Sequence, residues 1–120
     1  MAYKGFSLKE WIEQAEKSEN FESHKVYIIE VFNEDEKFIK IGRTFNAVEK
    51  RFSMDGSLPY SYKIINIIED NAYRVFHLET KLKRMCKQYS YKPKLKFKGV
   101  KECFTLDALD VLKQNNYVNT

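Results

Sequence analysis

The segment KVYIIEVFNEDEKFIKIGRT, residues 25–44, decides how this chain folds. Two runs rich in Val, Ile, Tyr and Phe, at 26–32 and 38–42, flank the polar sequence at 33–36. A connection of four polar residues between two such runs is typical of a β-hairpin. We therefore predict an antiparallel pair of strands here.

The register of this hairpin follows if Phe32 pairs with Lys37. Tyr27 then lies opposite Gly42, and Lys40 is its diagonal neighbour. Because side chains alternate across a strand, Tyr27 and Lys40 share one side of the sheet, over a glycine that leaves room beside the backbone. Arg43 is expected on the opposite side. A bulge within the hairpin would break this parity.

The rest of the chain alternates helical and extended patterns. A capping box of Ser7 and Glu10 opens an N-terminal helix, and Thr105 is the predicted cap of the last one. Glu79 falls at the border of an apolar helical stripe, near the core but not inside it. The expected elements are helices at 7–20, 46–56, 71–89 and 107–113, a third strand at 62–70 apolar enough on both faces to be central, and an extended segment at 92–106.

These elements predict an α/β fold with a small central mixed three-stranded sheet, helices on both faces and an extra N-terminal helix. With 120 residues the chain fits a single domain, residues 1–120. We divide it into an appended helix at 7–20, a core at 25–104, and a C-terminal helix and tail at 105–120.

Composition excludes several classes of protein. Hydrophobic residues make up 43% and charged residues 32%, which is typical of a soluble globular chain. No membrane span or signal peptide is predicted, so we expect a protein of the cytosol or of a nucleus, or of a host cytoplasm if it is viral. The two cysteines, Cys86 and Cys103, are too few for a disulfide framework or a zinc site, and we expect small buried side chains.

Charge is distributed unevenly along the chain. Residues 1–36 contain nine acidic residues and four lysines, whereas residues 81–101 contain nine basic residues and no acid. A basic stretch of this kind favours a polyanionic partner such as nucleic acid. The alternatives are lysines that maintain solubility or that protect an exposed edge strand. The candidate nucleic-acid contacts are Arg43, Lys83, Lys87, Lys92, Lys94, Lys96 and Lys98.

Several motifs together resemble the GIY-YIG endonuclease superfamily over residues 25–104. They are Tyr27 in the first strand, Lys40-Ile41-Gly42 ending the second, Arg51 in the next helix, Glu79 in a later helix, and the GVKECF segment at 99–104. The Lys-Ile-Gly variant resembles the phage and fungal branch. The resemblance implies a metal-dependent DNA endonuclease that hydrolyses phosphodiester bonds.

The resemblance also implies roles for individual residues. Glu79 would bind Mg²⁺ or Mn²⁺, and Arg51 would contact a phosphate oxygen. Tyr27 would orient or deprotonate the attacking water. Lys40 would supply positive charge beside Tyr27 or hold the phosphate, and Gly42 would be structural. DNA is the expected partner, with no membrane and no small-molecule cofactor, and an oligomer is left open.

The sequence also departs from the family pattern. Lys25-Val26 precedes Tyr27 where a glycine is usual, Lys40 replaces a tyrosine, Arg51 is not followed by a histidine, and Glu102 stands near the place of an asparagine. These departures keep two alternatives open: a non-cleaving nucleic-acid-binding module of the same fold, or a viral protein-binding inhibitor that uses the acidic first helix. Individually, Tyr27 could pack on the sheet, Lys40 and Arg51 could be solvated, and Glu79 could pair with Lys83.

Overall fold

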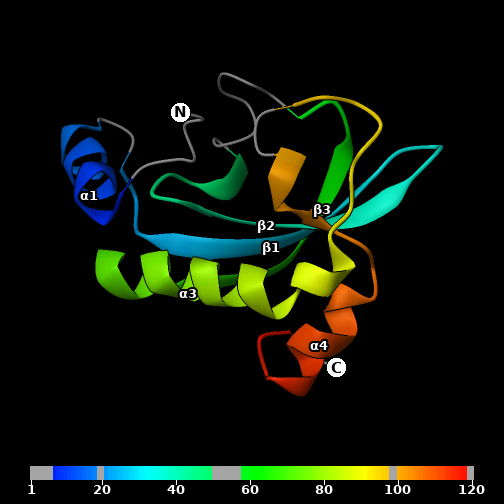
Figure 1. The fold of residues 1–120 in the computed structure, drawn as a ribbon. Helices are drawn as coiled ribbons and strands as arrows, with labels where there is room; N and C mark the ends of the chain where they lie inside the picture. Colours follow the sequence, from blue (N-terminus) through cyan, green and yellow to red (C-terminus); the bar gives the residue numbers. More distant parts are fainter. Residues whose placement is uncertain (1–6, 19–20, 50–57, 98–99, 119–120) are drawn as a thin grey trace.

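The computed structural model of the protein describes residues 7–18, 21–49, 58–97 and 100–118. Its elements form a small α/β fold (Figure 1). In chain order they are α1 (Leu8–Lys17), β1 (Lys25–Phe32), β2 (Lys37–Thr44), β3 (Ser61–Glu69), α3 (Ala72–Met85), the 3-10 turns η1 (Lys87–Tyr89) and η2 (Val100–Glu102), β4 (Cys103–Phe104) and α4 (Ala108–Gln114).

Within the described residues, the sheet has four strands in the order β3-β1-β2-β4, and neighbouring strands are antiparallel. The predicted mixed, three-stranded sheet is therefore wrong. β4 adds a fourth strand by pairing Cys103 with Lys40 and Phe104 with Ile39. The third predicted strand is also not central, because β3 lies at an edge and its residues are half-buried or exposed.

The hairpin of β1 and β2 has the predicted register. Tyr27 pairs with Gly42, Ile29 with Lys40 and Phe32 with Lys37, and all eight residues of each strand are paired. A register shift occurs between β1 and β3 instead, at Ile28 and Ile29. The parity of the hairpin is therefore intact, and its two strands are buried on both faces as the central strands of the sheet.

The two faces of the sheet are covered differently. One face packs against α1, α3 and α4 in a core that includes Trp11, Ile28, Ile41, Val75 and Leu112. Figure 1 shows α3 and α4 on this side and residues 91–97, which follow η1, running over the other side. We call the first the helix face and the second the tyrosine face.

On the tyrosine face, Ile29, Val31 and Phe38 pack against aromatic side chains of the segments at 58–64 and 91–97. The helix predicted after Thr44 begins on this side, since Val48 and Glu49 are helical and Val48 is buried. Its continuation, with Arg51 and Gly56, lies outside the described residues. Among the described residues, α1, α3 and α4 all cover the helix face. We had expected helices on both faces of the sheet.

The lysine-rich segment is an irregular strap rather than an extended strand over its described part, residues 92–97. Glu36, at the end of the hairpin turn, binds this strap through hydrogen bonds. The carboxylate accepts hydrogen bonds from the Tyr60 and Tyr91 hydroxyls at 2.5 Å each and from the Lys94 backbone N–H. The bond to Glu36, together with burial, raises the pKa of Tyr91 to about 12. Tyr91 therefore stays a neutral donor at neutral pH.

Helix caps follow the sequence in part. The Ser7 and Glu10 capping box of α1 is present, with both reciprocal hydrogen bonds. The expected cap at Thr105 is wrong, because Asp107 is the N-cap residue of α4 and contributes no side-chain hydrogen bond. None of the described helices combines the length and apolar character needed to cross a membrane.

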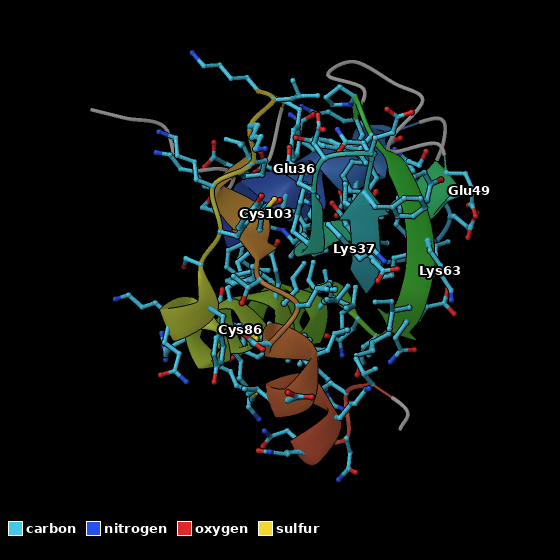
Figure 2. All side chains as sticks on the ribbon, turned by 90° about the vertical axis from the view of Figure 1, so that its right-hand side faces the viewer. Glu36, Lys37, Glu49, Lys63, Cys86 and Cys103 are labelled. Atoms are coloured by element: carbon cyan, nitrogen blue, oxygen red, sulfur yellow. The ribbon has the colours of Figure 1, made fainter. Side chains whose placement is uncertain are left out.

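The two cysteines lie on opposite faces of the sheet. Cys86 packs in the core of the helix face and Cys103 in that of the tyrosine face, and both are buried free thiols. Figure 2 shows Cys103 near Glu36 and Cys86 apart from both, beside α3 and α4. Burial raises the pKa of the Cys103 thiol to about 12. Their predicted role as small buried side chains is confirmed.

Candidate functional site

Tyr27 and Lys40 form a fully buried polar pair on the tyrosine face. Both side chains are 0% exposed. The Lys40 ammonium donates a hydrogen bond to the Tyr27 hydroxyl at 2.7 Å and lies 4.9 Å from the centre of its ring. β1 and β2 supply one residue each, on the same side, as the hairpin parity predicts. An isolated charge in such a place is costly, so the ammonium needs partners.

Gly42 makes room for the tyrosine ring. A Cβ atom at this position would lie 2.4 Å from the Tyr27 hydroxyl oxygen and 2.6 Å from Cζ. These separations are far below van der Waals contact, so any larger residue would displace the ring. The absence of a side chain at Gly42 therefore gives the Tyr27 ring its place beside Lys40.

Glu102 is the counterion of Lys40, and sequence reasoning had given it no role. Because Cys103 of β4 pairs with Lys40, the preceding residue, Glu102, is brought beside the buried ammonium. Its carboxylate accepts from Lys40 at 2.9 Å and from Lys83 at 2.6 Å. A lysine inside a hydrophobic strand indicates that an acidic partner lies nearby. The sequence does not show which acid it is, because Glu102 is 62 residues from Lys40.

The charges of this cluster shift each other's ionisation. Burial by itself would lower the pKa of Lys40, but attraction to Tyr27 and Glu102 outweighs it and raises the pKa above its ordinary value. Burial would likewise raise the pKa of Glu102, but Lys40 and Lys83 lower it to about 2. Lys40 is therefore a cation and Glu102 an anion at neutral pH.

Glu79 lies on α3 inside the protein, with 3% of its side chain exposed. The prediction that it stays outside the core is wrong, because two cations accompany it inward. One carboxylate oxygen accepts from Arg43 Nη1, and the other accepts from Lys83 Nζ at 3.1 Å. Pairing with Lys83, one turn along the helix, was the ordinary alternative for this residue, and it is present alongside the contact with Arg43.

Arg43 points to the helix face, as its position in β2 predicts. Its guanidinium carbon lies 5.0 Å from the ring centre of Trp11 and 4.5 Å from that of Phe76. Its side chain is 16% exposed. Aromatic faces attract a guanidinium through their quadrupole. Arg43 is thus held by two rings and a carboxylate, and it is not a free surface cation.

The polar groups form one continuous chain. It runs from Tyr27 and Lys40 on the tyrosine face through Glu102 and Lys83 to Glu79 and Arg43 on the helix face. The roles implied by the family resemblance place Glu79 and Tyr27 in one site, whereas the structure links them indirectly, through Glu102 and Lys83. Arg51, the remaining predicted catalytic residue, lies outside the described residues.

The predicted nucleic-acid contacts divide into two groups. Lys83, like Arg43, is occupied in ion pairs within the chain of polar groups. The exposed group comprises Lys87, Lys92, Lys94 and Lys96. Lys98 lies outside the described residues. The exposed lysines, three of them on the strap, are the described part of the predicted surface that is available to a polyanion.

The possible ligands for a divalent metal ion at this site are two carboxylates. The described residues contain no group of three His, Cys, Asp or Glu side chains arranged around a metal position. Two carboxylates, Glu79 and Glu102, do flank the ammonium of Lys83. Mg²⁺ is commonly bound by one or two carboxylates together with water and phosphate oxygens. Two carboxylates alone could therefore hold a hard cation only together with water or phosphate oxygens.

One known domain family covers most of the chain. The chain matches the T5orf172 domain over residues 24–116 and belongs to that family. This is a phage-associated domain found in some nuclease-like proteins and related to the GIY-YIG fold, although the match is not to a specific GIY-YIG family. The comparisons with curated proteins and with solved structures gave no match. The matched region includes the site residues and leaves α1 outside.

Proposed function

We propose that the protein is a metal-dependent endonuclease that hydrolyses phosphodiester bonds of DNA. The observation that carries the proposal is the buried pair of Lys40 and Tyr27, 2.7 Å apart over a glycine. Fully buried charged and polar groups are costly to a fold, and they concentrate at functional sites. Membership of a family found in some nuclease-like proteins supports the proposal.

Tyr27 and Lys40 have different roles toward the attacking water. The Tyr27 hydroxyl orients the attacking water, and the Lys40 ammonium, 2.7 Å from that hydroxyl, supplies positive charge beside it. Lys40 is itself a cation, since its pKa is raised by Tyr27 and Glu102 against the effect of burial, so it is not the base. The phosphate must approach Tyr27 from the tyrosine face of the sheet for this step.

Glu79 and Glu102 would hold the divalent cation. A bound Mg²⁺ or Mn²⁺ supplies stabilisation of the negative charge on the phosphate and the leaving oxygen. For its binding, Lys83 has to release the carboxylate oxygens that it contacts. The Lys83 side chain is 29% exposed, so it reaches solvent beside the two carboxylates. Arg51 contacts the phosphate in this proposal, on the basis of the family resemblance alone.

DNA is the proposed substrate because the basic charge is exposed beside the site. Lys87 follows α3, which carries Glu79, and the strap carries three further exposed lysines. Contacts of lysine with phosphate supply affinity without reading sequence. The half-buried Tyr91 and Phe97 pack inward on the tyrosine face, so the described aromatic residues of the strap support the fold more than they offer platforms for bases.

Plasmid nicking in the presence of Mg²⁺ or Mn²⁺ tests the proposal. We expect the wild-type chain to nick, and Glu79→Ala and Arg51→Ala each to reduce the rate by about a thousandfold. Glu13→Ala is the matched control, because it removes the charge of an exposed glutamate on α1. Nicking that survives in the Glu79 variant would overturn this assignment of the active site.

A second candidate function is a nucleic-acid-binding module that does not cleave. The observation that favours it is that both oxygens of Glu79 and of Glu102 already bond cations of the protein. DNA binding that weakens steeply with salt, without any product that depends on a metal ion, would decide for this function. Binding and cleavage are therefore measured on the same DNA and at the same salt concentrations.

A further inference from the structure

Helix α1 lies outside the region that defines the family, yet it contacts the site. Trp11, on the buried side of α1, is 3% exposed. Its ring lies 5.0 Å from the guanidinium carbon of Arg43, and the ring of Phe76 on α3 lies 4.5 Å from the same atom. Two aromatic residues from different helices therefore hold one arginine of β2.

This aromatic contact determines how Arg43 meets Glu79. A guanidinium is a planar fork with five donors, and its orientation decides which donor faces an acceptor. In the structure, Nη1 donates to Glu79 Oε1, while Oε2 of the same carboxylate faces Lys83. If the guanidinium turned, this division of the two carboxylate oxygens between Arg43 and Lys83 would be lost.

We infer that Trp11 is a positioning residue, and that α1 fixes the orientation of Glu79 through Trp11 and Arg43. Trp11 is itself fixed by neighbours on the same face. Its ring makes an edge contact with His24, with 4.7 Å between ring centres, and α1 buries Ala15 one turn further on. The effect on cleavage rests on the proposed function, whereas the effect on Arg43 does not.

Two substitutions separate this role from ordinary core packing. Trp11→Phe keeps an aromatic face for the guanidinium, and Trp11→Leu keeps an apolar side chain without one. A merely structural role predicts that both variants behave alike. The matched control is Val75→Ala, which removes methyl groups from the same core on α3 and leaves the aromatic contact in place.

The measurement is the NMR signal of the Arg43 guanidinium in the full chain labelled with ¹⁵N. We expect rotation about its Nε–Cζ bond to be slow in the wild type, in Trp11→Phe and in Val75→Ala. In Trp11→Leu it should become about tenfold faster, which corresponds to the loss of one cation-π contact. Equal rates in wild type and Trp11→Leu, or an equal rise in Val75→Ala, would overturn the inference.

Cleavage kinetics extend the test to the site. In an active enzyme, Trp11→Leu lowers kcat several-fold while KM changes little, and Trp11→Phe retains kcat. An equal loss in both variants would count against the aromatic contact. If no chain cleaves DNA, wild type included, but the Arg43 signal responds as expected, then the proposed function fails and the inference stands.

Discussion

The two faces of the sheet bury positive charge in different ways. On the tyrosine face, Lys40 is completely buried and its ammonium bonds a hydroxyl and a carboxylate. On the helix face, Arg43 keeps 16% of its side chain exposed and lies against two aromatic rings. An ammonium is a compact, strongly hydrated charge, whereas a guanidinium is planar, weakly hydrated and able to stack. The lysine therefore depends on its few polar partners far more than the arginine does.

Lys40 and Arg43 are three residues apart in one strand, so their side chains point to opposite faces. The connection between the faces is made by residues from elsewhere in the chain, Glu102 and Lys83, which share a contact at 2.6 Å. A substitution on either face is thus expected to affect the other face, but the change in the free energy of unfolding should differ between the two faces. Four substitutions or conditions measure that difference.

The largest loss of stability is expected for Lys40→Met. This variant removes the Lys40 donor from Tyr27 and one of the two lysines that bond Glu102. Removing one partner of a buried ion pair typically costs about 3–5 kcal/mol. The free energy of unfolding, measured with urea, should fall by that amount. Lys63→Met, which changes an exposed lysine of β3, is the control and should leave it unchanged.

The hairpin and its consequences could be predicted from the sequence because they are local. The alternation of side chains and the short polar turn determine the register, and the register determines that Tyr27 and Lys40 meet over Gly42. The pairing of β4 with β2 could not be predicted in this way, since it joins a strand of two residues to a strand far away in the chain. Glu102 was missed for the same reason, because its position depends on that pairing.

The burial of Glu79 could not be predicted from the helix alone. Its place at the border of the apolar stripe predicts partial exposure, and the two cations that draw it inward come partly from another element. The position of Arg43 between Trp11 and Phe76 likewise depends on how α1 docks. Periodicity identifies the faces of each element, but it does not identify which charges meet between elements.

The second effect concerns pH and Glu102. Its pKa is lowered to about 2 in the folded protein by Lys40 and Lys83, against the opposing effect of burial. The stabilisation is therefore present above the ordinary pKa of a glutamate and is lost as the pH falls from about 5 to 2. The upper bound of this loss is about 3 kcal/mol. Comparing urea unfolding of the wild type and Glu102→Gln over this range isolates the contribution of Glu102.

A wild-type curve parallel to that of Glu102→Gln would contradict the prediction. It would show that the carboxylate gains nothing from its two lysines in the folded state. Ion pairing with Glu102 would then not contribute to the stability of buried Lys40. The difference between Lys40 and Arg43 would depend on burial rather than on ion pairing.

The third effect is that of Gly42→Ala. The new Cβ would lie 2.4 Å from the Tyr27 hydroxyl oxygen, so the ring must move and its bond to Lys40 is broken or lengthened. Overpacking of this kind typically costs about 1–3 kcal/mol. We expect a loss near 2 kcal/mol in the free energy of unfolding, and in an active enzyme a loss of nicking. Unchanged stability and activity would show that the ring is not confined by the glycine.

The smallest effect is expected on the helix face, for Arg43→Lys. The variant keeps a positive charge for Glu79, which also retains Lys83, but it loses the planar group that lies against Trp11 and Phe76. A cation-π contact contributes about 0.5–2 kcal/mol, so the free energy of unfolding should fall by about 1 kcal/mol. Arg74→Lys is the matched control, because Arg74 is 71% exposed and should tolerate the change. A loss as large as that of Lys40→Met would remove the distinction between the faces, since it would show that the arginine depends on its partners as strictly as the lysine does.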